Sequence, residues 1–114
     1  MSELHNYLEE IPEVFWLEDG AFQAKSGIVP IDAIADLPSV QGIYIVITDN
    51  DEILYVGRAG DLHERWRTGH HKVVNFFTYA YPNIMYVELP ELSRGELSKL
   101  ETYYIRKLKP LAQG

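Results

Sequence analysis

Two apolar segments in the middle of the chain predict a β-hairpin. Residues 42–48 form a continuous run of β-branched and aromatic side chains, which is typical of a buried central strand. The polar residues 49–52 predict a turn, and residues 53–57 predict the returning antiparallel strand. Residues 84–89 alternate enough to predict a third strand, which Pro90 ends.

Capping patterns predict two helices. Asp61, with Glu64 three residues later, predicts the start of a short helix that Gly69 ends. A second pattern of this kind, Ser-x-x-Glu at 93–96, opens a helix that runs to about residue 109. The order β-β-α-β-α predicts an α+β fold, in which a three-stranded antiparallel sheet is flanked by helices.

Residues 1–41 precede these elements and are interpreted as an N-terminal extension packed on or capping the domain of residues 42–114. The extension has a short amphipathic start, a hairpin signal at residues 18–20, and a turn-rich stretch from Pro30 to Pro38. Its own role is left open.

Composition limits the chemistry and the location. The chain has 114 residues, which fits one compact domain, and no cysteine, which excludes disulfides, thiol catalysis and zinc–thiolate sites. The acidic start lacks the layout of a signal peptide, and no apolar run approaches the ~20 residues needed to cross a bilayer. We therefore expect a cytoplasmic protein that does not associate with membranes.

Charge is distributed unevenly along the chain, whose formal net charge is −7. Residues 1–52 carry 11 acidic residues and one cation, whereas residues 53–114 carry 9 cations and 6 acidic residues. Acidic surfaces keep small proteins soluble, which explains the first half well enough. The basic second half includes a cluster of cations and favours contact with nucleic-acid phosphates. The cluster consists of Arg58, Arg65, Arg67 and Lys72.

Glu101 is a carboxylate on the apolar face of the predicted C-terminal helix. That face is defined by apolar residues at helical spacing, namely Leu97, Leu100, Tyr104 and Leu108. Glutamate is rarely buried unless it is paired or holds a metal ion. Glu101 is therefore a candidate metal ligand. Taken alone, the pattern favours the alternative of a structural ion pair with an arginine such as Arg65.

The hairpin and the short helix add candidate phosphate-binding groups. If Val46 pairs with Tyr55, then Tyr44 and Tyr55 share one face of the sheet as diagonal neighbours, whereas a one-residue slip separates them. On one face their hydroxyls could reach a phosphate or a water; the alternative is ordinary sheet packing. Arg65 lies beside the apolar side of the short helix, where it could offer a donor fork to a phosphate. The alternative is a surface arginine.

The histidines do not predict a zinc site. His63, His70 and His71 fit no strong ligand spacing, so we expect instead that one histidine acts as a proton donor or base near neutral pH.

Several motifs together resemble the GIY-YIG nuclease family. Gly42-Ile43-Tyr44 and Tyr55-Val56-Gly57 resemble its paired signature, with valine for the middle isoleucine. The run YVGRAGDLHERW resembles the family's next segment, with Arg65 at the usual ten-residue distance from Tyr55. Glu101 matches the family's metal-binding glutamate, and LKPLAQG resembles its closing motif. The resemblance covers roughly residues 42–113.

The resemblance implies a metal-dependent endonuclease that hydrolyses phosphodiester bonds in nucleic acid, with DNA the favoured substrate and RNA still open. The implied cofactor is one Mg²⁺ or Mn²⁺ held by Glu101. The resemblance also implies catalytic roles for four residues. Tyr44 would be the general base, and the other three would be Tyr55, Arg65 and His70. Arg58 and Gln113 would contact phosphate.

Three positions depart from the family pattern. Gln113 stands where the family usually has asparagine, and Arg58 stands where many relatives have lysine. Gly69 occupies a place often held by histidine or tyrosine, with His70 one residue later. An alternative function is therefore a catalytically inactive nuclease-like module that binds nucleic acid or protein.

The chain contains no recognisable DNA-reading module. We therefore expect a homodimer or a partner protein to supply DNA specificity. A third hypothesis is that acidic residues 1–41 bind a basic partner or mask the basic face.

Overall fold

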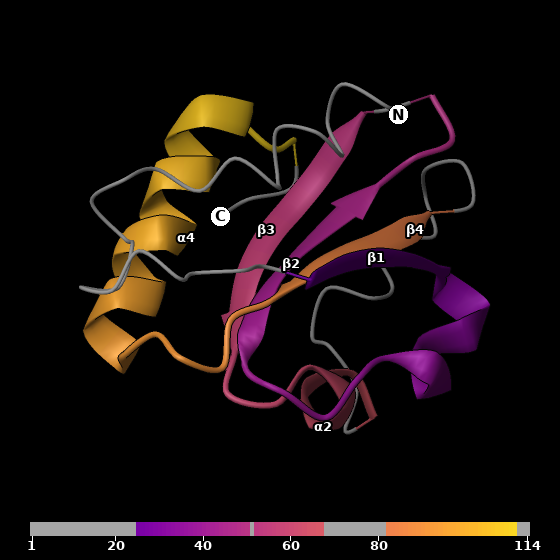
Figure 1. Ribbon diagram of the computed structural model, residues 1–114. Helices are drawn as coiled ribbons and strands as arrows, with labels where there is room; N and C mark the ends of the chain where they lie inside the picture. The colour runs from indigo at the N-terminus through magenta and orange to yellow at the C-terminus, as the bar shows by residue number, and fades with distance from the viewer. Residues whose placement is uncertain (1–24, 51, 68–81, 112–114) are drawn as a thin grey trace.

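The structure is a computed structural model that describes residues 25–50, 52–67 and 82–111. A four-stranded antiparallel sheet forms the centre of the fold, with helices on both of its faces (Figure 1). The predicted α+β class is confirmed. In chain order the elements are β1 (Lys25–Pro30), the 3-10 helix η2 (Ile31–Asp36), β2 (Gly42–Ile47), β3 (Ile53–Ala59), α2 (Leu62–Arg67), β4 (Asn83–Glu88) and α4 (Arg94–Leu108).

The sheet has four strands in the order β1-β4-β2-β3, whereas the sequence predicts three. The additional strand is β1, which pairs along the whole of β4, from Lys25 opposite Glu88 to Pro30 opposite Asn83. Its glycine and terminal proline obscure the strand pattern in the sequence, but both are tolerated in an edge strand. Part of the predicted N-terminal extension is thus a strand of the sheet. The division at residue 41 stays a prediction.

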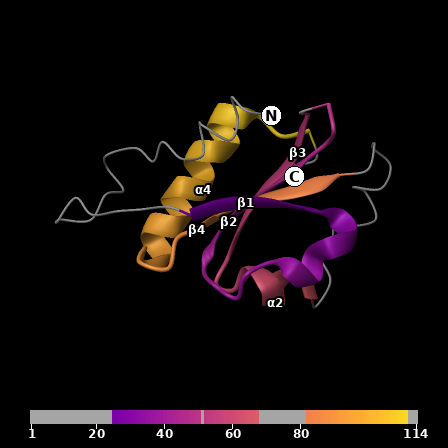
Figure 2. The same cartoon turned by 45° about the vertical axis from the view of Figure 1, so that its right-hand side comes forward.

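Strand β2 lies in the middle of the sheet, and all six of its residues are buried. Its side chains alternate between two cores because successive residues of a strand point to opposite faces. Ile43, Ile45 and Ile47 join the core beneath α4. Tyr44 and Val46 join the core beneath α2 and η2. Figure 2 shows α4 on one side of the sheet and α2 with η2 on the other.

Helix α4 begins and ends close to the predicted positions. At its start the Ser93 hydroxyl accepts a hydrogen bond from the Glu96 N–H at 3.2 Å, and the Glu96 carboxylate accepts one from the Ser93 N–H at 2.9 Å. Lys109 ends the helix with φ 49°, and its N–H donates to the Ile105 carbonyl. The Gln41 side-chain amide also donates to the carbonyls of Leu89 and Leu92, which fixes the turn between β4 and α4.

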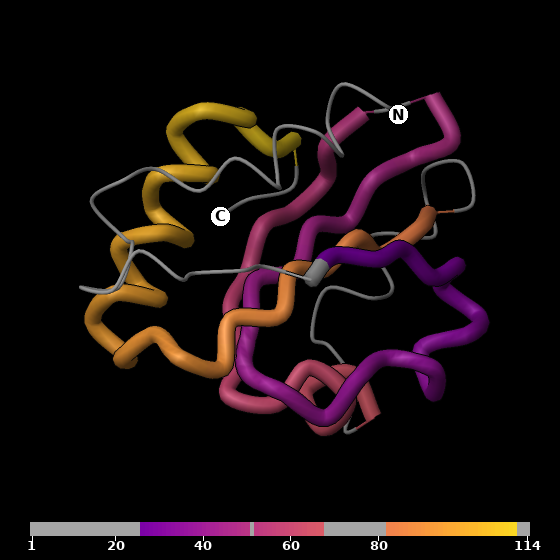
Figure 3. The backbone as a smooth tube through the Cα atoms, viewed as in Figure 1, coloured from indigo at the N-terminus to yellow at the C-terminus, as the bar shows by residue number. Residues whose placement is uncertain are grey.

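Helix α2 follows β3 after a two-residue connection, and Figure 3 shows this tight passage of the backbone. The predicted cap is confirmed, because the Asp61 carboxylate accepts a hydrogen bond from the Glu64 N–H at 2.9 Å. Residues 30–38, predicted to be turn-rich, contain η2. The hairpin predicted at residues 18–20 and the helix end at Gly69 lie outside the described residues. Within the described ranges, no helix has the length and apolar character needed to span a bilayer.

Candidate active site

The register of the hairpin brings the two signature tyrosines together. Val46 pairs with Tyr55 and Tyr44 pairs with Gly57, so the side chains of Tyr44 and Tyr55 lie on the same face. Their rings are stacked, with centroids 6.2 Å apart and an interplanar angle of 20°. The predicted diagonal arrangement is therefore confirmed.

Gly57 provides the space in which the Tyr44 ring lies across β3. A Cβ atom at position 57 would come within 2.5 Å of the Tyr44 hydroxyl oxygen and 2.9 Å of a ring carbon. Real Cβ atoms essentially never approach other heavy atoms so closely. The glycine of the second signature tripeptide is thus required by the tyrosine of the first.

Arg65 projects from α2 toward the tyrosines and is half-buried. Burial raises the pKa of Tyr44 well above its usual range, and this effect is larger than the opposing ones. The charge of Arg65 and its hydrogen bond to the Tyr44 side chain act in the opposite direction and lower that pKa. The Tyr44 phenol therefore keeps its proton at neutral pH, and Arg65 is the group that most favours its ionised form.

Glu101 lies on the α4 side of the same site. Its side chain is 22% exposed, and its Oε1 lies 3.4 Å from Nε of Arg58. Burial raises the pKa of Glu101, while the guanidinium and a backbone hydrogen bond of Arg58 oppose this effect. The arginine paired with Glu101 is therefore Arg58 and not Arg65, the example predicted from the sequence.

The two halves of the site meet around β3, which is an edge strand of the sheet. Tyr55 points toward the α2 side of the strand and Arg58 toward the α4 side, as the alternation of the register requires. Glu101 is near enough to raise the pKa of both Tyr44 and Tyr55 electrostatically. The structure thus brings together the five described residues predicted for the site, namely Tyr44, Tyr55, Arg58, Arg65 and Glu101.

The other two predicted site residues, His70 and Gln113, lie outside the described residues, and their roles stay predictions. Among the histidines considered, His63 is described; its Nδ1 lies 3.2 Å from the Leu37 carbonyl oxygen. Within the described part of the chain, no three His, Asp or Glu side chains gather into a metal site. Among the described residues, Glu101 is therefore the candidate ligand for a cation at this site.

Two further residues shape the site without having been predicted from the sequence. Trp66 packs edge-on against the Tyr44 ring, with centroids 5.3 Å apart, and is almost fully buried. Arg94 shares with Arg58 a cavity of about 250 Å³ between the end of β3 and the start of α4. A signal for Arg94 was present, because a cation in the first turn of a helix is unfavourable to the helix dipole and suggests another use.

Chemically, the site combines two phenols, two guanidinium groups and a carboxylate at one edge of a sheet. Phenols and guanidinium groups donate hydrogen bonds to phosphate oxygens, and a carboxylate is a preferred ligand of Mg²⁺. Comparison with known proteins points the same way, because the sequence model of the GIY-YIG catalytic domain matches residues 40–113. The chain belongs to the GIY-YIG family.

Solved structures agree with this assignment at the level of the fold. Three structures of the GIY-YIG N-terminal endonuclease domain of UvrC from Thermotoga maritima superpose with a TM-score of 0.55. They are 22–24% identical to this chain, cover 71% of it and are themselves covered over 90–91% of their length. Each of these domains is bound to its catalytic divalent cation, which is magnesium in one of them. No curated protein matches the chain.

Proposed function

We propose that this chain is a divalent-metal-dependent endonuclease that hydrolyses phosphodiester bonds in DNA. The observation that supports this most is the meeting of Tyr44, Tyr55, Arg65 and Glu101 around the edge strand β3. A group of tyrosines, an arginine and a half-buried carboxylate is better explained by binding of a polyanionic substrate and a cation than by packing in a structural core.

Glu101 fits the role of metal ligand. Burial raises the pKa of its carboxyl group, and the positive charge of Arg58 opposes this effect, as a bound cation would. When bound, Mg²⁺ or Mn²⁺ would stabilise the charge that develops on the phosphate and on the leaving oxygen. The UvrC domains, each bound to its catalytic divalent cation, support this assignment.

Arg65 and Arg58 would hold the phosphate from the two sides of β3. A guanidinium offers a rigid fork of donors that matches two phosphate oxygens, and its charge stabilises the more negative transition state. Arg65 is half-buried and hydrogen-bonded to Tyr44, which limits its freedom. The side chain of Arg58 is 48% exposed and so remains accessible to substrate.

Tyr44 is the proposed general base, with Tyr55 positioning the attacking water. Arg65 favours the ionised form of the Tyr44 phenol, whereas burial opposes it. Proton removal by Tyr44 therefore depends on positive charge gathered at the site. In this proposal His70 relays a proton and Gln113 contacts phosphate. A homodimer or a partner protein would supply DNA specificity, and the cytoplasmic location stays a prediction.

The alternative is a nuclease-like module that binds nucleic acid without cutting it, and the Glu101–Arg58 ion pair favours it to some extent. The two functions are separated by incubating supercoiled plasmid and labelled branched DNA with Mg²⁺ or Mn²⁺. We expect wild-type protein to cut and the Glu101→Ala variant, folded but unable to hold the cation, to leave the DNA intact. Binding without cleavage by folded, metal-supplied wild type would assign the chain to the alternative.

A further inference from the structure

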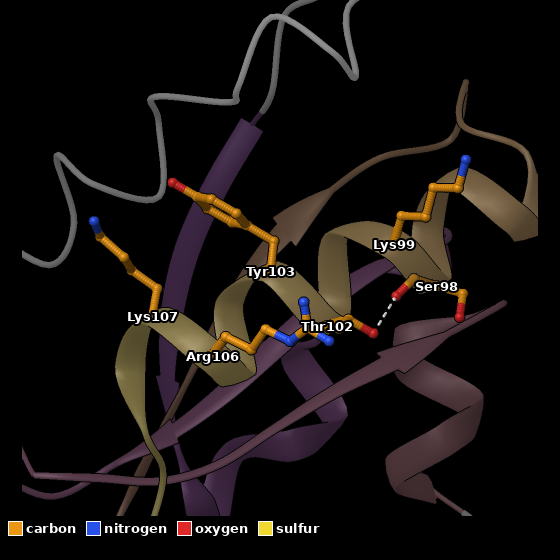
Figure 4. A pocket seen from close by; sticks show the side chains of 6 residues that line it. All are labelled: Ser98, Lys99, Thr102, Tyr103, Arg106 and Lys107. Atoms are coloured by element: carbon orange, nitrogen blue, oxygen red, sulfur yellow. Dashed lines mark hydrogen bonds between the residues drawn. The ribbon is translucent and has the colours of Figure 1, made fainter.

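The outer face of α4 carries a second concave surface, which is separate from the proposed active site. It is a groove of about 460 Å³ lined by Ser98, Lys99, Thr102, Tyr103, Arg106 and Lys107. Figure 4 shows that all six side chains come from α4; Tyr103 is half-buried and packs against the core beneath the helix. We refer to this surface as the α4 groove.

The α4 groove is strongly basic in a chain whose net charge is −7. Among the described residues that line it, three are cations and none is acidic. Within the described residues, Lys99, Arg106 and Lys107 have no ion pair, whereas Arg58 is paired with Glu101 and Arg67 with Glu64. Lys99 interacts electrostatically with Glu96, but cations concentrated on one helix without a close ion pair among the described residues indicate a polyanionic partner.

We propose that the α4 groove binds the sugar–phosphate backbone of the nucleic acid beside the cleavage site. This inference rests on the proposed function, because it assigns a further contact to the same substrate. Lys99 and Arg106 are seven residues apart, which is about 10 Å along a helix and equals the rise of about three nucleotides along the axis of a duplex. The Ser98 hydroxyl adds a hydrogen-bond donor suited to phosphate, whereas the Thr102 hydroxyl donates to the Ser98 carbonyl at 3.1 Å.

The position of the α4 groove allows this contact to orient the substrate relative to Glu101. Glu101 lies on the same helix, and α4 is held at its start by a capping box and packs against β2 and β3. A sugar–phosphate backbone of the nucleic acid bound on the outer face of α4 would thereby be fixed relative to the Glu101 carboxylate, which lies toward β3. Contacts to phosphate set the orientation of the substrate without reading its sequence.

The test is the salt dependence of binding to a labelled DNA duplex, measured in EDTA so that no cleavage occurs. Each phosphate contact contributes a slope of about −0.9 to the logarithm of affinity against the logarithm of salt concentration. For the K99Q/R106Q/K107Q variant we expect the slope of this salt dependence to become less steep by between about 1 and 3. Its affinity for DNA at 0.1 M salt should be lower by about eightfold for each lost contact.

Single variants provide a matched control. R106Q and R67Q remove the same charge from exposed positions on opposite faces of the sheet, but the Arg67 charge is already paired with Glu64. We expect R106Q alone to weaken DNA binding. An equal loss in both variants would indicate a general effect of net charge and would contradict the assignment of the groove.

Failure of this inference is distinguishable from failure of the proposed function. If wild type binds and cuts DNA but the triple variant keeps the wild-type salt slope, the α4 groove does not contact the substrate and the nuclease assignment stands. If the triple variant binds DNA normally but loses stability or changes its oligomeric state, the groove is occupied by acidic residues of the chain itself or by a second copy. If wild type binds no nucleic acid, both proposals are wrong.

Discussion

Replacing Gly57 with alanine places a methyl group against the ring of Tyr44. The new Cβ would lie within 2.5 Å of the tyrosine hydroxyl oxygen, so either the ring or β3 must move. The ring has little room, because Tyr44 is 1% exposed and contacts both Tyr55 and Trp66. Overpacking of this kind destabilises proteins by about 1–3 kcal/mol.

Activity should fall further than stability in the Gly57→Ala variant. A displacement of about 1 Å in an active-site group can reduce turnover by about 100-fold, and the substitution acts on the proposed general base itself. The free energy of unfolding would be measured by urea denaturation, and turnover by nicking of supercoiled plasmid. Gly60→Ala is the matched control, because nothing lies within 4 Å of a Cβ at that position. We expect the control to change stability by about 0.5 kcal/mol or less.

A background without the Tyr44 ring isolates the physical cause. In Tyr44→Ala protein the added methyl group at position 57 meets an empty space, so its destabilising effect should largely disappear. Wild-type stability and turnover in Gly57→Ala, or an equal loss with and without the ring, would refute the steric explanation.

Three other predictions concern single groups. Arg65→Lys keeps the charge but loses the pair of guanidinium donors, so turnover should fall by about 100-fold or more while the unfolding midpoint stays near wild type. Unchanged turnover would exclude a role for Arg65 in holding the phosphate. Ser93→Ala removes the cap of α4 and should lower the free energy of unfolding by about 1 kcal/mol, whereas Ser39→Ala, an exposed control, should not. Burial raises the pKa of Tyr104 in the folded protein, so its contribution to stability is present below the unfolded pKa of about 10 and is lost as pH rises further. Tyr104→Phe should therefore weaken the alkaline loss of stability by about 1.4 kcal/mol per pH unit, and identical slopes above pH 10 would contradict this.

The sequence was most informative where local signals and tertiary packing agree. The strands of the hairpin follow from their apolar and β-branched residues, although their register was left open, and the limits of α4 follow from its capping box and from Pro110. The placement of Glu101 on the buried side of α4 follows from helical periodicity alone. The prediction that this carboxylate and the two tyrosines belong to one site came from the resemblance to the GIY-YIG family.

What escaped prediction depends on contacts between distant segments. Strand β1 acquires its conformation by pairing with β4, more than 50 residues later in the chain, and its own residues carry a weak strand pattern. The pairing of Glu101 with Arg58 depends on which side of β3 each arginine meets, which only the assembled sheet determines. Packing of Trp66 against Tyr44 likewise requires α2 to lie on the tyrosine face.

The central claim is that one divalent cation, held by Glu101, enables this chain to cut DNA. It is tested most directly by the single-turnover rate of cleavage of a labelled strand, measured against Mg²⁺ concentration for wild type and for Glu101→Gln. We predict that the wild-type rate rises with Mg²⁺ concentration, with a logarithmic slope of about one, and then saturates. The Glu101→Gln variant keeps an oxygen ligand but loses the charge, so its rate should be lower by about 100-fold or more at every Mg²⁺ concentration. Cleavage that is independent of metal, or a wild-type rate in folded Glu101→Gln protein, would contradict it.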